Sequence, residues 1–191
     1  MILVVCEGKV TEPQYVEGFR LARGANTVRV RVESPGGDPL ALVERAIAIR
    51  DDAAQRAKRE RDDNLRFDEV WCVLDVDQHA RLEAARTLAG KADVQLALSN
   101  PCFELWLFLH FAEHAAHVKP DQAARLLRKH LPQYDKHLRF EDLDPGYADA
   151  VRRAEALDRH HAGLDQEGAN PSTGVYRLTE QIRRFGKEAR L

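Results

Sequence analysis

Two aspartates at the end of an apolar run are the residues of this chain best suited to chemistry. Asp75 and Asp77 are separated by one residue and follow the apolar residues 70–74. Side chains of an extended segment alternate between faces, so both carboxylates point the same way, with Cα atoms roughly 6–7 Å apart. Mg²⁺ is usually held by one or two carboxylates together with water and substrate phosphates. The spacing therefore suits a hydrated divalent cation; alternatively, Asp75 caps the next helix and Asp77 is solvated.

A second acid stands at the end of the first apolar run. Glu7 follows residues 2–6, and Gly8 then permits a tight turn or the close approach of a ligand. Thr11 is predicted to cap the first helix. Ligands of open α/β sheets bind beyond the carboxyl ends of strands, where the strand order switches. Glu7 and the aspartate pair therefore share one site if their strands are neighbours, and otherwise Glu7 is a solvated loop acid.

An acid within an aromatic segment needs a partner. Glu104 lies in residues 101–111, which are otherwise almost wholly apolar, and burying an unpaired carboxylate there is costly. It requires a metal ion, an arginine or lysine, or a path to water, and the sequence leaves all three open. Ser99 or Asn100 is predicted to cap this helix, with Pro101 in its first turn.

Several further residues are candidates for binding a phosphate. An Asn-Pro pair at Asn170 precedes Ser172 and Thr173, and we expect a helix start there whose free N–H groups hold a phosphate, with ordinary capping as the alternative. Lys136, in a loop, could contact a phosphate or complete an acid–base pair, or simply be solvated. His79 follows the aspartate pair closely and is a candidate at the mouth of the site.

Strand and helix patterns alternate along the first half of the chain, which predicts a parallel sheet flanked by helices. After residue 100 the pattern is helical. We therefore predict an α/β fold with a central parallel sheet of about four strands, residues 1–112 forming the core and residues 113–191 a helical extension packed on it. The predicted strands are 2–6, 27–33, 69–74 and 94–98, and the predicted helices are 12–23, 39–60, 78–90, 101–111, 120–130, 148–161 and 172–186.

The composition narrows the class of protein. Of 191 residues, 44% are hydrophobic and 31% charged, and no apolar run approaches the ~20 residues of a membrane helix. The first apolar stretch lacks the basic flank of a signal peptide, so we expect a cytoplasmic protein without membrane association. Cys6, Cys72 and Cys102 are predicted to be reduced and buried. A net charge of −2 gives no general attraction to nucleic acid.

Taken together, these motifs resemble the RloB-like family, whose core is a Toprim (topoisomerase–primase) fold. The resemblance spans roughly residues 2–180. Its matching pieces are residues 4–9 with Thr11-Glu12-Pro13, Asp75-Val76-Asp77 with His79, residues 99–106, and Asn170-Pro171-Ser172-Thr173.

The resemblance implies a Mg²⁺-dependent nuclease, with Mn²⁺ as a substitute ion, in a phage-defence or restriction-associated setting. In Toprim proteins such acids bind Mg²⁺ and serve the cleavage or joining of nucleic-acid strands. Carried over, Asp75 and Asp77 are metal ligands, and Glu7 is a metal ligand or general acid/base. Glu12 and Glu104 are further acids of the motif.

The expected partners are DNA or RNA, with Lys9 as a phosphate-binding residue, and a defence-system protein such as an ATPase. Two other functions stay open: a non-catalytic module that binds nucleic acid or a partner protein, and a phosphohydrolase that uses the D-x-D motif on small molecules.

Overall fold

A mostly parallel five-stranded sheet forms the centre of the protein. The computed structural model describes residues 1–32, 38–76, 81–164 and 168–188. The strands lie in the order β2-β1-β3-β4-β5. The first four are parallel, and β5 pairs antiparallel with β4. The predicted α/β fold is confirmed, with one strand more than expected. The strands are β1 (Ile2–Cys6), β2 (Val28–Val32), β3 (Glu69–Asp75), β4 (Gln95–Asn100) and β5 (Ser172–Thr173).

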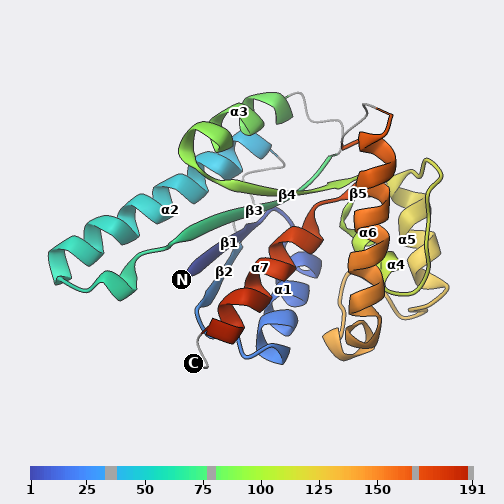
Figure 1. Ribbon diagram of the computed structural model, residues 1–191, viewed down its shortest axis with the longest axis horizontal. Helices are drawn as coiled ribbons and strands as arrows, with labels where there is room; N and C mark the ends of the chain where they lie inside the picture. The colour runs from blue at the N-terminus through green and yellow to red at the C-terminus, as the bar shows by residue number, and fades with distance from the viewer. Residues whose placement is uncertain (33–37, 77–80, 165–167, 189–191) are drawn as a thin grey trace.

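Helices cover both faces of the sheet (Figure 1). Helices α2 and α3 lie on one face, α1 and α7 lie on the other, and α4 to α6 lie towards the β5 edge. No helix within the described residues is both long and apolar enough to cross a membrane. The helices are α1 (Thr11–Ala22), α2 (Pro39–Glu60), α3 (Leu82–Ala92), α4 (Phe103–Leu109), α5 (Pro120–Arg128), α6 (Tyr147–Ala162) and α7 (Val175–Glu188), with 3₁₀ turns η1 (Asp63–Leu65), η2 (Phe140–Asp142) and η3 (Asp144–Gly146).

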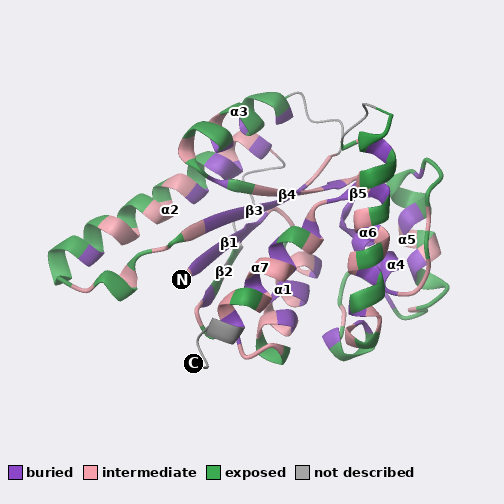
Figure 2. Ribbon diagram, viewed as in Figure 1, coloured by how far each residue is buried: buried purple, intermediate pink, exposed green. Residues whose placement is uncertain are grey.

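The strands separate two hydrophobic cores because their side chains alternate between faces. In β1, Ile2 and Val4 join the core that includes α1 and α4, whereas Leu3 and Val5 join the core beneath α2 and α3. All five residues of β1 are buried, as expected for a strand covered on both sides. Figure 2 shows the same pattern, with β1 and the middle of β3 buried.

The strand order switches between β1 and β3. From β1 the chain runs through α1 to β2, and it then returns through α2, on the opposite face, to β3. The register pairs Cys6 with Val73, and the Glu7 N–H donates to the Val73 carbonyl oxygen at 3.2 Å. Ligands of open α/β sheets bind at such a point. Glu7 and Asp75 thus lie at the ends of adjacent strands that flank the switch.

Two predicted helix starts are wrong. Asn100 ends β4 and α4 begins at Phe103, while Ser172 and Thr173 form β5 and α7 begins at Val175. The Asn100–Pro101 and Asn170–Pro171 peptide bonds are both cis. The hydroxyls of Ser99 and Thr173 lie 2.9 Å apart across the β4–β5 pair. Strand pairing between residues far apart in sequence therefore overrides the local capping signals.

A close approach between η3 and α4 gives a test of the packing. A Cβ atom built on Gly146 would lie 2.1 Å from the backbone oxygen of His110, whereas one on Gly90, within α3, has no atom within 4 Å. We expect Gly146→Ala to lower the free energy of unfolding by about 1–2 kcal/mol through overpacking. Gly90→Ala, the control, should raise it by about 0.5–1 kcal/mol because glycine disfavours helix interiors. Urea unfolding measures both; equal effects would contradict the packing.

Candidate active site

The side chain of Asp75, the last residue of β3, lines a cavity between α1 and α4. Asp75 has the same strand parity as Trp71 and Val73, which pack into the core of α1 and α4, so its side chain faces that side of the sheet. The cavity has a volume of about 280 Å³. Most of its lining comes from the turn after β1 and from the start of α4. The lining residues are Gly8, Lys9, Val10, Thr11, Glu12, Asp75, Phe103, Glu104 and Lys136.

The carboxyl groups around this cavity influence one another. Burial, followed by the negative charges of Glu12, Glu104 and Glu7, raises the pKa of Asp75 well above its usual value. Burial also raises the pKa of Glu12, against the lowering effects of a backbone hydrogen bond and of Lys136, and the charges of Glu104 and Glu7 add to the rise. Like charges gathered with little solvent disfavour ionisation. The site thus concentrates negative charge that a cation would relieve.

Glu104 forms an ion pair with Lys136. The Lys136 ammonium donates a hydrogen bond to Glu104 Oε1, and the Tyr134 hydroxyl donates to the same oxygen at 2.9 Å. Burial by itself would raise the pKa of Glu104, but the hydrogen bond and charge of Lys136 outweigh it and the pKa is lowered. Of the three partners left open by the sequence, the structure shows a lysine.

Thr11 fixes the loop that carries this lysine. Its hydroxyl donates to the Lys136 carbonyl oxygen at 2.7 Å and lies 3.2 Å from the Tyr134 hydroxyl. Thr11 is the first residue of α1, whose N-cap is Val10 without a side-chain hydrogen bond, so the predicted capping role is wrong. Lys136 has a φ of 82°, which is unusual for a residue with a side chain. Thr11 was missed as a site residue because both of its partners, Tyr134 and Lys136, lie more than 100 residues away along the chain. Tyr134 was missed because its contacts with Thr11 and Glu104 depend on how the chain folds back.

Gly8 makes room for the carboxylate of Glu12. A Cβ atom at Gly8 would lie 2.0 Å from Glu12 Oε2, so a side chain at this position would displace the carboxylate from its place against the turn after β1. Lys9 is exposed and lines the same cavity. The turn after β1 and the first residues of α1 therefore form one side of the cavity.

The other predicted site residues lie elsewhere or fall outside the part of the chain that the structure describes. Asp77 and His79 fall outside the described residues. The Asn100 side chain donates to the Gly168 carbonyl oxygen at 3.0 Å. The Asn170 side chain accepts from the Val118 N–H at 2.9 Å and donates to the Val118 carbonyl oxygen at 2.8 Å. Ser172 and Thr173 line a second cavity. The cavity between α1 and α4, here called the acid cavity, is lined by the predicted residues Lys9, Glu12, Asp75, Glu104 and Lys136. Glu7 lies near enough for its charge to raise the pKa of Asp75. Asn100, Asn170, Ser172 and Thr173 do not line this cavity.

The donors at this site suit a hard cation. Within residues 1–32, 38–76, 81–164 and 168–188, no group of three His, Cys, Asp or Glu side chains is arranged to hold an ion. Mg²⁺ is usually held by one or two carboxylates with water and substrate phosphates. Asp75 is the candidate ligand here, and Glu7 lies near enough for its charge to raise the pKa of Asp75. The three cysteines are buried, and burial raises the pKa of Cys72 to about 12, so these thiols stay protonated.

One of three comparisons with known proteins gave a match. The comparison with protein families matches "RloB-like protein" over residues 2–182. No curated protein and no solved structure matches the chain. The matched region runs from the first strand to α7 and includes every element that surrounds the acid cavity. The chain belongs to the RloB-like protein family.

Proposed function

We propose that this protein is a Mg²⁺-dependent nuclease that hydrolyses phosphodiester bonds in nucleic acid. The observation that carries the proposal is the gathering of carboxylates at the switch point. Asp75 ends β3 and Glu7 directly follows the adjacent parallel strand β1, and burial together with the charges of Glu12, Glu104 and Glu7 raises the pKa of Asp75. A role in phage defence or restriction belongs to the proposal and rests on the family resemblance alone.

Each acid has a part in this reaction. Asp75 and Glu7 would hold the ion, which when bound neutralises charge on the scissile phosphate and lowers the pKa of a water molecule. Glu12, whose pKa is raised by burial, is suited to give a proton to the leaving oxygen or to take one from water. Lys136 keeps Glu104 ionised and, at the rim of the cavity, adds a positive charge for the phosphate.

The tyrosines favour hydrolysis over strand joining. A topoisomerase reaction needs a tyrosine hydroxyl free to attack the phosphate. Each of the four tyrosine hydroxyls in this chain is in a hydrogen bond: Tyr15 with His110, Tyr134 with Glu104, Tyr147 with Thr179 and Glu180, and Tyr176 with Asp158. Burial raises the pKa of the first three further from neutrality. Water is therefore the better nucleophile.

Removal of the metal tests this proposal. The purified protein should nick plasmid DNA or cut labelled RNA in Mg²⁺ or Mn²⁺, and EDTA should stop the reaction reversibly. Gel electrophoresis of both substrates measures this, with an Asp75→Asn/Asp77→Asn variant as the control for contaminating nucleases. Cutting that persists in the variant, or in EDTA, would contradict the proposal.

Two other outcomes would reassign the function. Release of inorganic phosphate from small phosphomonoesters, without strand cutting, would indicate a phosphohydrolase. Binding of nucleic acid without turnover in any divalent metal would indicate a non-catalytic module.

A further inference from the structure

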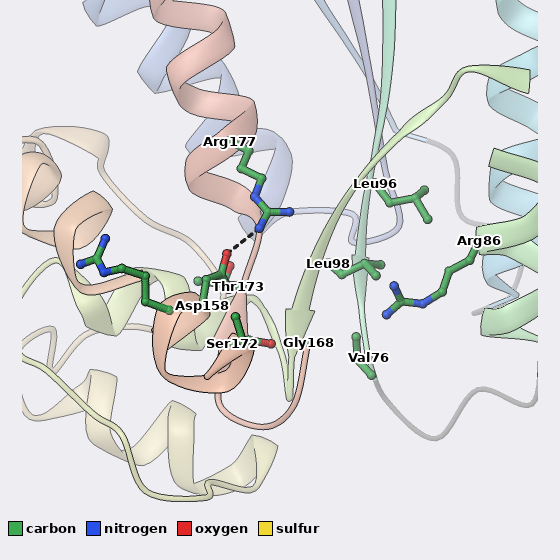
Figure 3. A pocket seen from close by; sticks show the side chains of 12 residues that line it. Val76, Arg86, Leu96, Leu98, Asp158, Gly168, Ser172, Thr173 and Arg177 are labelled. Atoms are coloured by element: carbon green, nitrogen blue, oxygen red, sulfur yellow. Dashed lines mark hydrogen bonds and ion pairs between the residues drawn. The ribbon is translucent and has the colours of Figure 1, made fainter. Parts of the chain in front are cut away.

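A second and larger cavity lies on the other side of β4. It has a volume of about 520 Å³. Leu96 and Leu98, which pack towards α2 and α3, form its apolar floor together with Val76, and residues from α6 and the β5–α7 turn form a wall. Figure 3 shows Arg86 reaching in from α3, opposite Arg177. We call this cavity the arginine groove.

Arginines outnumber acids among the described residues that line the arginine groove. Among the described lining residues, the charged ones are Arg86, Arg159, Arg177 and Asp158, three cations against one anion. Asp158 is already engaged, because it pairs with Arg177 at 2.7 Å and accepts from the Tyr176 hydroxyl at 2.8 Å. The groove therefore presents two further guanidinium groups, from α3 and α6, without a buried acid to neutralise them.

Arg86 and Arg159 each form only a weak ion pair. Arg86 pairs with Glu83 at 3.4 Å and Arg159 with Glu155 at 3.8 Å, and both guanidinium side chains are exposed. Exposed pairs of this kind contribute little, so a ligand can displace them at small cost. A guanidinium group matches the oxygen geometry of a phosphate and can bind two of its oxygens at once. The groove is thus built to receive phosphates.

The arginine groove begins where the acid cavity ends. Asp75 lines the acid cavity and Val76, the next residue, lines the groove. Consecutive residues of an extended segment face opposite sides of a sheet, so the two cavities lie on either side of the carboxyl end of β3. A ligand with several phosphates can therefore occupy both.

We propose that the arginine groove binds the phosphate backbone of a nucleic-acid strand whose scissile bond lies in the acid cavity. This inference rests on the proposed nuclease function. Arg86 and Arg159 hold successive phosphates, and the apolar floor of Leu96 and Leu98 lies under the sugars and bases. Such contacts read no base sequence and fix the position of the strand relative to the acids.

Binding measured without metal tests the groove separately from catalysis. We compare wild type with Arg86→Gln/Arg159→Gln by fluorescence anisotropy of a fluorescein-labelled single-stranded oligonucleotide in EDTA. The double variant should bind about tenfold more weakly, and the slope of log affinity against log salt should fall by about 1.4, or ~0.7 for each lost phosphate contact. The matched control is Arg56→Gln/Arg59→Gln, which removes two exposed arginines from the far end of α2 and should bind as wild type does.

The outcomes separate this inference from the nuclease proposal. Three results overturn the proposed role of the groove: an equal loss of affinity in both double variants, no loss of affinity in Arg86→Gln/Arg159→Gln, or no binding of the oligonucleotide by wild type. Displacement of the oligonucleotide by inorganic phosphate at equal phosphate concentration also overturns it, because the groove would then hold single phosphates. If the groove variant alone loses affinity and salt dependence but no metal supports cutting, the groove stands and the nuclease proposal fails.

Discussion

Asp75→Asn is expected to abolish metal-dependent cutting and, at the same time, to make the metal-free protein more stable. A bound metal ion provides several kcal/mol of transition-state stabilisation, so the loss of a ligand should lower the cleavage rate by about 10³-fold or more. The metal-free wild type, however, gathers this carboxylate with three other acids. Replacing the buried charge with a neutral amide removes its desolvation cost and that repulsion, and should raise the free energy of unfolding by about 1–3 kcal/mol near neutral pH.

The stability gain should depend on pH in a defined direction. Burial and the neighbouring acids raise the pKa of Asp75 in the folded state above its unfolded value. The folded state therefore binds more protons than the unfolded state between those two values, and the wild type loses stability as the pH rises through that interval. The asparagine variant lacks this loss. The difference between the two proteins should be small below the unfolded pKa of about 3.9 and should grow as the pH rises.

Thermal unfolding in EDTA across this pH range measures the difference, and a cleavage assay in Mg²⁺ measures the rate. The control is Asp121→Asn on α5, where the aspartate is exposed and pairs with Arg125 at 2.9 Å. Its stability should change by no more than about 0.5 kcal/mol at any pH, with full cleavage. If Asp75→Asn is instead less stable than wild type at neutral pH, the carboxylate has a stabilising partner in the folded state. That result would contradict the clustering of unneutralised acids around Asp75.

Local signals in the sequence were enough to find the elements that hold the first half of the site. The predicted helix 39–60 matches α2, because Asp38 caps it and Pro39 occupies its first position, both short-range effects. The apolar run 2–6 matches β1, and Glu7 follows it. The position of β1 next to β3 was a condition of the site prediction, and the strand pairing meets it.

Contacts between residues far apart along the chain could not be predicted from local sequence patterns. The antiparallel pairing of β5 with β4 depends on a contact between Ser99 and Thr173, 74 residues apart, and nothing near Ser172 distinguishes a two-residue strand from a helix start. The link between Thr11 and the Lys136 loop spans 125 residues. The apolar residues around Glu104 in the sequence indicated that its carboxylate needs a partner. The identity of that partner depends on how the chain folds back.

The Glu104–Lys136 pair leads to the second large effect. Lys136→Met removes the ammonium group from the buried Glu104 carboxylate, which keeps its hydrogen bond from the Tyr134 hydroxyl. Breaking a buried ion pair typically costs about 3–5 kcal/mol, but the lysine side chain is 64% exposed and water screens the pair, so we expect a loss of about 1–2 kcal/mol. Cleavage should fall about 10- to 100-fold, as for the loss of a group that orients a site.

The pH dependence identifies the cause of that loss. Lys136 lowers the pKa of Glu104 in the folded protein, so the pair stabilises the fold above the unfolded pKa of about 4.3, and this stability disappears as the pH falls through the folded value. The deficit of Lys136→Met should therefore be full at neutral pH and shrink in acid. Urea unfolding at neutral pH and in acid measures this deficit.

Three companion variants separate charge from backbone and packing. Lys136→Gly also removes the amine but suits the φ of 82°, so it should lose less stability than the methionine variant, by up to about 1 kcal/mol. Lys136→Arg should keep most of the stability because the positive charge remains. Adding Glu104→Gln to Lys136→Met removes the unpaired charge and should recover part of the loss. If the double variant is as unstable as the sum of its parts, the two side chains act independently and Lys136 does not hold Glu104 for the site.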